Sequence, residues 1–259
     1  MENDSFSLYR YRTIDKHLID ALVNQTLYFA TPVCLNDPFD CLINQRKIFE
    51  QAIATTNETH RKELLSIYVD TKHFFSNWNT HIHNSGLCCF SKEANIPLLW
   101  AHYADGHKGL CIEYTFFGTD FAPDGNGPFA VSVMGDVQYI ANPILQLLLN
   151  HPIHEIEKAI SKPETKDGLV FMKALLRNYL FSKSPSWSYE QEWRFIRMKS
   201  GLYKPRIDRP LISKICFGLR TSEEDKNLIL KLAQQYCANV KFSHMVHDDT
   251  EFGFREHPF

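Results

Sequence analysis

Residues 187–197 read Trp-Ser-Tyr-Glu-Gln-Glu-Trp-Arg-Phe-Ile-Arg, the most informative segment of the sequence. At the two-residue period of an extended chain, Glu190, Glu192 and Arg194 fall on one side. The alternating aromatic residues fall on the other side and favour a half-buried strand. We therefore predict a strand over 189–197 with two carboxylates on one face, about 7 Å apart at roughly 3.3 Å per residue. The alternative is an edge strand with a solvent-exposed row of Glu and Arg, but the flanking aromatic residues favour a cleft.

Composition places the chain among ordinary globular proteins. Its 259 residues are 44% hydrophobic and 22% charged, which is enough to bury a proper core. No apolar run approaches the ~20 residues that a membrane helix needs, and the polar first residues do not resemble a secretion signal. The seven cysteines form no Cys-X-X-Cys pair, so we expect free thiols in a reducing cytoplasm. With a net charge of −2, a nucleic-acid substrate would require local basic patches.

Short strands and unevenly spaced helices alternate along the chain. We predict strands over 8–12, 27–30, 86–91, 110–114, 212–217 and 240–245, with one or two more within 131–140. Helices are expected over 15–23, 45–79, 96–104, 143–161, 168–182 and 222–236. No repeat or linker divides the sequence. The pattern predicts an α+β fold, with one domain over 1–259 and helical insertions near 45–80 and 143–182.

Three further groups of residues have both a functional and a structural interpretation. Residues 31–40 are dense in turn formers, so they suit either the wall of a pocket or an ordinary Asx turn. His73, His81 and His83 lack a convincing set of further ligands, so we expect surface histidines and no metal. His102 lies beside two aromatic residues of a helix, which favours a core histidine over a catalytic base.

Three segments follow the order that ADP-ribosyltransferases use. That family has a first strand with Arg or His, a middle strand ending in Ser or Thr, and a late strand with a catalytic Glu. The matching segments here are Leu8-Tyr9-Arg10-Tyr11, Cys89-Phe90-Ser91 and Glu190-Gln191-Glu192. The last is similar to the Glu-X-Glu of the Arg-Ser-Glu subclass, whereas the middle strand lacks the fuller Ser-Thr-Ser of many relatives. Together with its Asn-Asp-Pro-Phe-Asp and Trp-Ala-His-Tyr-Ala motifs, the chain resembles bacterial ADP-ribosyltransferase toxins of phage-defence systems, one of which modifies mRNA.

The resemblance implies an ADP-ribosyltransferase-like fold with a split, mixed or antiparallel sheet, and NAD as the donor of ADP-ribose. Arg10, or Arg12 in its place, would bind the pyrophosphate through the guanidinium fork. Tyr28 would stack on or contact the nucleotide, because aromatic faces attract flat cations such as nicotinamide. The structural alternatives are a surface ion pair for Arg10 and a core position for Tyr28.

The same resemblance assigns the chemistry to the acidic segment. Glu192 would stabilise the oxocarbenium-like state formed when the glycosidic bond breaks, and would hold the ribose. Glu190, further along the strand, would polarise or deprotonate the acceptor. Ser91 would orient Glu192 by a hydrogen bond, unless it is simply the hydroxyl at a strand end.

The implied function is a cytoplasmic, NAD-dependent mono-ADP-ribosyltransferase toxin without a bound metal or a membrane partner. RNA, and mRNA in particular, is the favoured acceptor; DNA and protein are possible acceptors, and a protein antitoxin is the expected partner. One alternative is a metal-dependent nuclease or hydrolase in which Asp37, Asp40, Glu190 and Glu192 converge on a divalent ion. The other is a non-enzymatic module that grips a protein partner through exposed aromatic residues.

Overall fold

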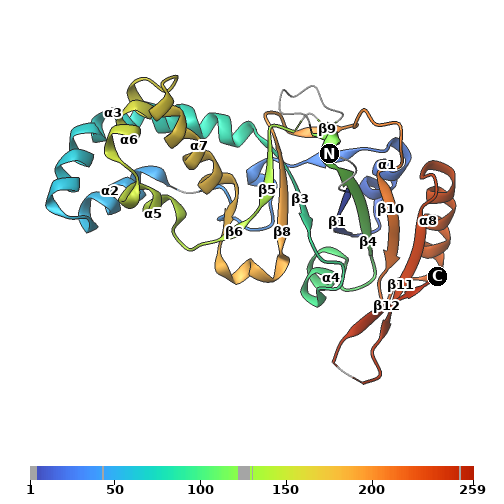
Figure 1. The fold of residues 1–259 in the computed structure, drawn as a ribbon. Helices are drawn as coiled ribbons and strands as arrows, with labels where there is room; N and C mark the ends of the chain where they lie inside the picture. Colours follow the sequence, from blue (N-terminus) through green and yellow to red (C-terminus); the bar gives the residue numbers. More distant parts are fainter. Residues whose placement is uncertain (1–4, 43, 122–128, 130, 251) are drawn as a thin grey trace. The chain divides into compact units, whose positions relative to one another are not determined.

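The computed structural model describes residues 5–42, 44–121, 129, 131–250 and 252–259 (Figure 1). The chain forms two compact units. Unit 1 comprises residues 1–29, 86–136 and 189–259, and unit 2 comprises residues 30–85 and 137–188. The segments near 45–80 and 143–182, which we expected as helical insertions, both belong to unit 2. That the chain is a single domain, with these two segments as insertions, stays a prediction.

An eight-stranded sheet forms the centre of unit 1 (Figure 1). In spatial order its strands are β12 (Phe254–Pro258), β11 (Lys241–His247), β10 (Ile212–Phe217), β4 (Leu110–Phe117), β1 (Ser5–Arg12), β3 (Gly86–Ser91), β8 (Glu192–Arg197) and β5 (Val133–Asp136). β10 and β11 run parallel, and the other neighbours are antiparallel. The predicted α+β class with a mixed sheet is therefore confirmed. The carboxyl-terminal strand β12 was not predicted.

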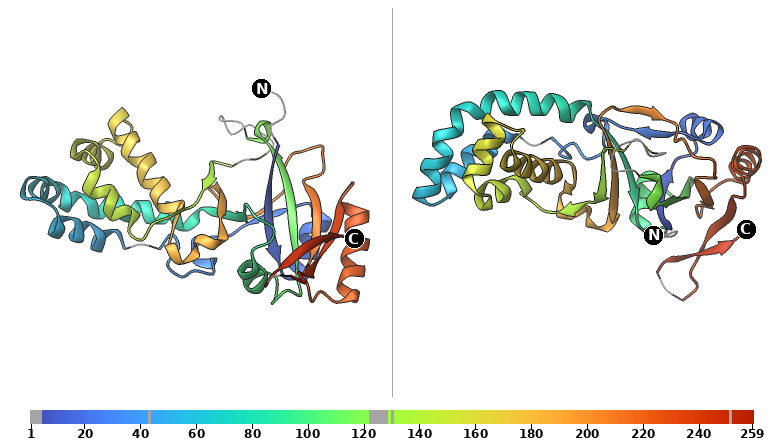
Figure 2. Two further views of the ribbon diagram at one scale, coloured as in Figure 1. Left: turned by 60° about the horizontal axis from the view of Figure 1, so that its bottom comes forward. Right: turned by 45° about the horizontal axis from the view of Figure 1, so that its top comes forward.

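One face of the sheet packs against α1 (Lys16–Asn24) and α8 (Glu223–Tyr236), which lie side by side (Figure 2). The core on this face contains alternate residues of the central strands, including Phe90, Ile112, Phe195 and Phe217. Both helices begin at a capping side chain: Asp15 accepts a hydrogen bond from the Leu18 amide, and Ser222 from that of Asp225. Such caps satisfy amide groups that a helix start leaves unpaired.

The opposite face of the sheet carries α4 (Pro97–Tyr103) and a second apolar cluster. Here Trp100 meets Tyr11 edge-on, with 5.3 Å between the ring centroids. Two glycines allow the chain to pass closely at the end of this layer. A Cβ at Gly109 would lie 2.2 Å from the carbonyl oxygen of Arg12, and one at Gly218 would lie 2.2 Å from that of His107. Any larger residue would force the backbone apart at these two points.

The sheet narrows between β1 and β3. β1 pairs with β4 along eight residues but meets β3 at the single pair Tyr9–Ser91. Ser91 is in turn paired with Glu192 of β8. Because residues directly opposite one another point to the same face, this row places the side chains of Tyr9, Ser91 and Glu192 on one face of the sheet.

A second, two-stranded antiparallel sheet joins β2 (Leu27–Phe29) to β9 (Gly201–Tyr203). Its inner side contributes Leu27 and Phe29 to the main core. Phe29 lies against Gly86, where an added Cβ would come within 2.8 Å of the Phe29 Cβ. The small sheet therefore sits at the Gly86 end of β3.

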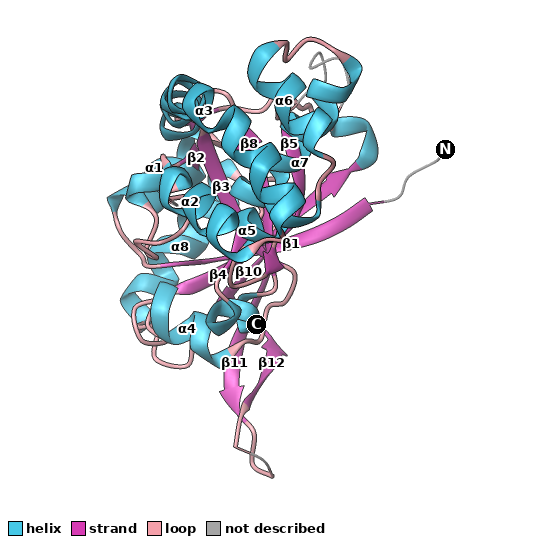
Figure 3. Ribbon diagram, turned by 90° about the vertical axis from the view of Figure 1, so that its left-hand side faces the viewer, coloured by secondary structure: helices cyan, strands magenta, loops and turns pink. Residues whose placement is uncertain are grey.

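Unit 2 is mainly helical (Figure 3). It contains η1 (Pro32–Cys34), α2 (Gln45–Thr55), α3 (Glu58–Asn84), α5 (Pro143–Asn150), α6 (Ile153–Ser161), α7 (Lys166–Leu180), and the short parallel pair β6 (Gln138–Tyr139) and β7 (Ser182–Lys183). Buried Gln45 joins its parts by hydrogen bonds to Asn79 of α3 and Tyr179 of α7. Within the described part of the chain, none of the helices combines the length and apolar character that crossing a membrane requires. All seven cysteines are free thiols, as predicted.

Candidate functional site

The acidic segment that the sequence singles out folds as a turn leading into a strand. A 3₁₀ helix, η3 (Pro185–Glu190), ends at Glu190, and β8 begins at Glu192. Between them Gln191 has a φ of 46°, in the left-handed region that costs a residue with a Cβ about 1 kcal/mol or more. The predicted strand over 189–197 is therefore wrong in its first three residues. Glu190 reaches its position from a helical turn, not by the alternation of a strand.

The backbone of this turn is held by the end of β3. The Ser91 hydroxyl donates to the Glu190 carbonyl oxygen at 2.8 Å and accepts from the Glu93 amide at 3.1 Å. The Lys92 amide donates to the Gln191 carbonyl oxygen at 3.0 Å. The expected hydrogen bond from Ser91 to Glu192 is wrong, because the Ser91 hydroxyl donates to the Glu190 backbone. Ser91 instead positions the turn that carries both acids.

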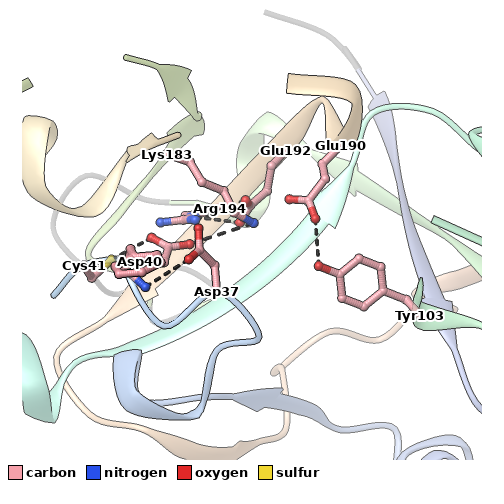
Figure 4. Close-up of polar contacts among 9 residues, drawn as sticks. Asp37, Asp40, Cys41, Tyr103, Lys183, Glu190, Glu192 and Arg194 are labelled. Carbon is pink, nitrogen blue, oxygen red and sulfur yellow. Dashed lines mark hydrogen bonds and ion pairs between the residues drawn. The ribbon is translucent and has the colours of Figure 1, made fainter. Parts of the chain in front are cut away.

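The two carboxylates have different partners (Figure 4). The Tyr103 hydroxyl donates to Glu190 Oε1 at 2.7 Å. Arg194 grips Glu192 with two bonds, from Nε to Oε1 at 2.6 Å and from Nη2 to Oε2 at 3.1 Å. Both acids are only 4% exposed, and Arg194 is fully buried. A bidentate pair of this kind fixes the plane of the Glu192 carboxylate.

Tyr103 ends α4 and lies among aromatic residues on the same face of the sheet. Burial, together with the charge of Glu190 and the hydrogen bond to it, raises the pKa of Tyr103 well above its ordinary value. Its hydroxyl therefore remains a proton donor to Glu190 under all physiological conditions. The exposed ring of His102 lies 6.3 Å from the rings of both Tyr103 and Tyr189. The expectation of a core histidine at His102 is wrong.

Arg10 and Arg12 lie on the other face of the sheet from Glu192. Residues alternate along β1, so Tyr9 shares a face with Ser91 and Glu192, whereas its neighbour Arg10 points the opposite way. Arg10 Nη1 donates to Cys88 Sγ at 3.3 Å, and its guanidinium lies 5.8 Å from the centre of the Phe90 ring. Arg12 lies 3.9 Å from Asp15. The structure thus does not bring either predicted pyrophosphate ligand to the acidic turn.

Tyr28 also lies apart from the acidic turn. It belongs to β2, at the Gly86 end of β3, whereas Ser91 ends that strand. The two ends of β3 are five residue-to-residue steps apart, about 17 Å at the usual rise. The Tyr28 side chain is 47% exposed, so the alternative of a core position for Tyr28 is wrong. The separation along β3 means that Tyr28 does not lie beside Glu192 either.

In unit 2, the loop over 31–40 contains an Asx turn, as one of the two interpretations expected. The Asp37 carboxylate accepts from the Phe39 amide at 2.9 Å, and Asp40 lies 3.9 Å from the Lys183 ammonium (Figure 4). His81 and His83 are exposed on α3, and the side chain of His73 lies outside the described residues. Among the residues that the structure describes, no group of three or more His, Cys, Asp or Glu side chains could hold a metal ion.

Two residues of the site were missed by sequence reasoning. Tyr103 lies in the Trp-Ala-His-Tyr-Ala motif, and Tyr9 alternates with the arginine that was preferred to it. Tyr9 is half-buried on the face of Glu192, and burial followed by the charge of Glu113 raises its pKa. The alternation of aromatic and basic residues over 8–12 was the available signal, but it did not indicate which set faces the acids.

Comparison with known proteins gives one family match. Residues 99–195 match a family of proteins of unknown function, DUF2971. This segment contains Tyr103 and the two acids of the turn, whereas Tyr9 and Ser91 precede it. No curated protein and no solved structure matches the chain.

Proposed function

We propose that the protein is an NAD-dependent mono-ADP-ribosyltransferase that modifies a macromolecule. The observation that supports this most is the acidic turn, which presents two buried carboxylates with different partners on the tyrosine-bearing face of the sheet. Its position beside the single β1–β3 pair suits the split sheet of an ADP-ribosyltransferase-like fold. RNA as the favoured acceptor, action as a cytoplasmic toxin in anti-phage defence and a protein antitoxin as partner rest on the sequence resemblance alone.

The chemistry divides between the two acids. The bond between the ribose C1′ and the nicotinamide nitrogen breaks, and nicotinamide leaves with the electron pair. Glu192, held rigidly by Arg194, is suited to stabilise the positive charge that develops on the ribose. The acceptor then bonds to C1′, and its proton passes to Glu190, which Tyr103 orients. Tyr9 and Tyr189 offer aromatic faces for the nicotinamide ring on the same side of the sheet.

The structure changes one part of the NAD assignment. Because Arg10 and Arg12 lie on the far face of the sheet, we withdraw them as pyrophosphate ligands of a donor bound at Glu192. We likewise withdraw Tyr28 as a contact to the nicotinamide. The proposal therefore rests on the turn and its tyrosines and assigns no residue to the pyrophosphate.

The test is transfer of label from NAD carrying ³²P in the adenylate phosphate. Purified protein is incubated with it and with separate RNA, DNA and protein pools, while nicotinamide release is measured in parallel. We expect Glu192→Gln to abolish both release and transfer. Glu190→Gln should abolish transfer while retaining part of the release. Glu93→Gln is the matched control, because Glu93 is an exposed acid close to the same turn.

Circular dichroism of each variant separates a lost function from a lost fold. No label on any of the three pools would contradict the proposal, as would transfer that Glu192→Gln preserves. Label on protein alone would overturn RNA as acceptor and leave the enzyme class standing. Nucleic-acid cleavage that needs a divalent ion and ignores NAD would support the hydrolase alternative instead.

A further inference from the structure

The small sheet of β2 and β9 has an outer side that carries apolar groups. In this pair Tyr28 lies directly opposite Leu202, so their side chains share a face. Their strand neighbours Leu27 and Phe29 are buried in the core, which turns Tyr28 and Leu202 outward. Tyr28 is 47% exposed and Leu202 is 70% exposed.

Exposed basic residues flank this outer side in the sequence. Residues 197–207 contain four basic residues and no acidic one, in a chain whose net charge is −2. Three of these, Lys199, Lys204 and Arg206, are exposed, and none has an ion-pair partner among the described residues. We call Tyr28, Leu202 and these three cations the basic ribbon.

Stacked side chains pack the inner side of the small sheet beneath the basic ribbon. The Arg197 guanidinium lies 4.1 Å from the centre of the Tyr203 ring and 5.2 Å from that of Phe29. Tyr203 meets Phe29 edge-on, with 6.1 Å between centroids. Arg197 therefore stacks on the inner side of the small sheet and supports it. Because the sheet is already packed, a ligand that binds its outer side would lose little free energy by ordering it.

We propose that the basic ribbon binds single-stranded nucleic acid. The combination of unpaired cations with an exposed aromatic ring is what such binding uses, because cations hold the phosphates and a base stacks on the ring. The positive charge of the basic ribbon favours a polyanion as its ligand. The exposed tyrosine ring favours a single-stranded polyanion, whose unstacked bases can stack on it. Tyr28, which we expected from the sequence to contact NAD, would on this proposal stack on a base of the nucleic acid.

The location connects the basic ribbon to the acidic turn, and this part of the inference rests on the proposed function. β8 begins at Glu192 and ends at Arg197, directly before the ribbon segment. The five residue-to-residue steps from Glu192 to Arg197 span about 17 Å. A single strand bound on the ribbon can therefore extend towards the acids, which would make the ribbon the docking surface of an RNA acceptor.

Binding is measured by fluorescence anisotropy with a labelled oligouridylate of about 20 nucleotides, over a series of salt concentrations. For the triple variant Lys199→Gln, Lys204→Gln, Arg206→Gln, the slope of log affinity against log salt should become shallower by about 2, since each phosphate contact contributes roughly 0.7. Tyr28→Ala should weaken binding about five-fold or more with the slope unchanged, because it removes a stacked base, whereas Tyr28→Phe should bind like the original protein. The matched control changes three exposed lysines elsewhere in unit 1 to glutamine: Lys108, Lys231 and Lys241.

Four results would overturn the inference: no binding of the oligonucleotide, an equal loss in the control triple variant, an unaltered Tyr28→Ala variant, or equal affinity for duplex of the same length. Glu192→Gln should bind RNA normally, which separates this inference from the proposed function. If RNA binding depends on the basic ribbon but no ADP-ribose is transferred from NAD, the binding proposal is supported and the proposed enzyme activity is contradicted. If transfer to RNA is unchanged in the ribbon variants, the enzyme activity is supported and the binding proposal is contradicted.

Discussion

Removing the Tyr103 hydroxyl should destabilise unit 1 and disturb Glu190. In Tyr103→Phe the ring remains, but the 2.7 Å hydrogen bond to the carboxylate is lost. A hydrogen bond to a charged group contributes roughly 1.5–3 kcal/mol, and the half-buried position of Tyr103 places the effect at the lower end, about 1.5 kcal/mol. For a unit of about 150 residues this lowers the melting temperature by roughly 3–6 °C.

Thermal unfolding followed by circular dichroism at neutral pH measures this loss. The matched control is Tyr114→Phe, because Tyr114 is also a core tyrosine of unit 1 but makes no side-chain hydrogen bond among the described residues. We expect that control to change the free energy of unfolding by less than about 0.5 kcal/mol. Equal melting temperatures for the two variants would refute the view that Tyr103 holds Glu190. Reduced transfer from NAD in Tyr103→Phe, at a temperature where it is folded, would add that the bond matters for the proposed reaction.

Three further changes test other parts of the structure. Glu192→Gln should lower the free energy of unfolding by about 3 kcal/mol in denaturant titrations, because it removes the carboxylate charge that pairs with the buried Arg194. Gly218→Ala should cost about 2 kcal/mol or more because its Cβ would meet a carbonyl oxygen, whereas Gly118→Ala, in open space, should be neutral. Burial raises the pKa of Tyr114 to about 12, so the folded chain keeps a proton that the unfolded chain loses above pH 10. Stability should therefore fall between about pH 10 and 12, and less steeply in Tyr114→Phe, as urea unfolding at each pH would reveal.

Much of the sheet could be predicted from the sequence because its strands have simple patterns. The apolar run over 86–91 is a central strand, and residues 212–217 are another, as their composition indicated. The helix predicted over 15–23 is found over 16–24, and Asp15 caps its start. These features depend on local chemistry, which a sequence carries directly.

The site could be predicted only in part, because the deciding features are not local. In the run Tyr9-Arg10-Tyr11-Arg12 the two residue types alternate, and each has an apolar body with a polar end. Which type faces the acids depends on the pairing of Tyr9 with Ser91, which is a contact across the sheet. The chain places the arginine beside Cys88 on one face and the tyrosine on the acidic face.

The turn at Gln191 is a second case of this kind. Glutamine has no special preference for the left-handed region, so nothing in Glu-Gln-Glu announces a break in the strand. The conformation persists because hydrogen bonds from Ser91, Lys92 and Tyr103 hold residues 190 and 191. A strained residue fixed by its surroundings is common at functional sites, since the strain sets the direction of neighbouring side chains.

The break at Gln191 also explains why two acids of similar sequence context can have separate roles. Had the strand continued, Glu190 and Glu192 would stand side by side on one face with the same neighbours. Instead the turn brings Glu190 to a neutral hydroxyl and leaves Glu192 against a guanidinium. Glu192 is thus held by a charged partner and Glu190 by a neutral hydroxyl, the difference in environment that the division of labour in the proposed transfer uses.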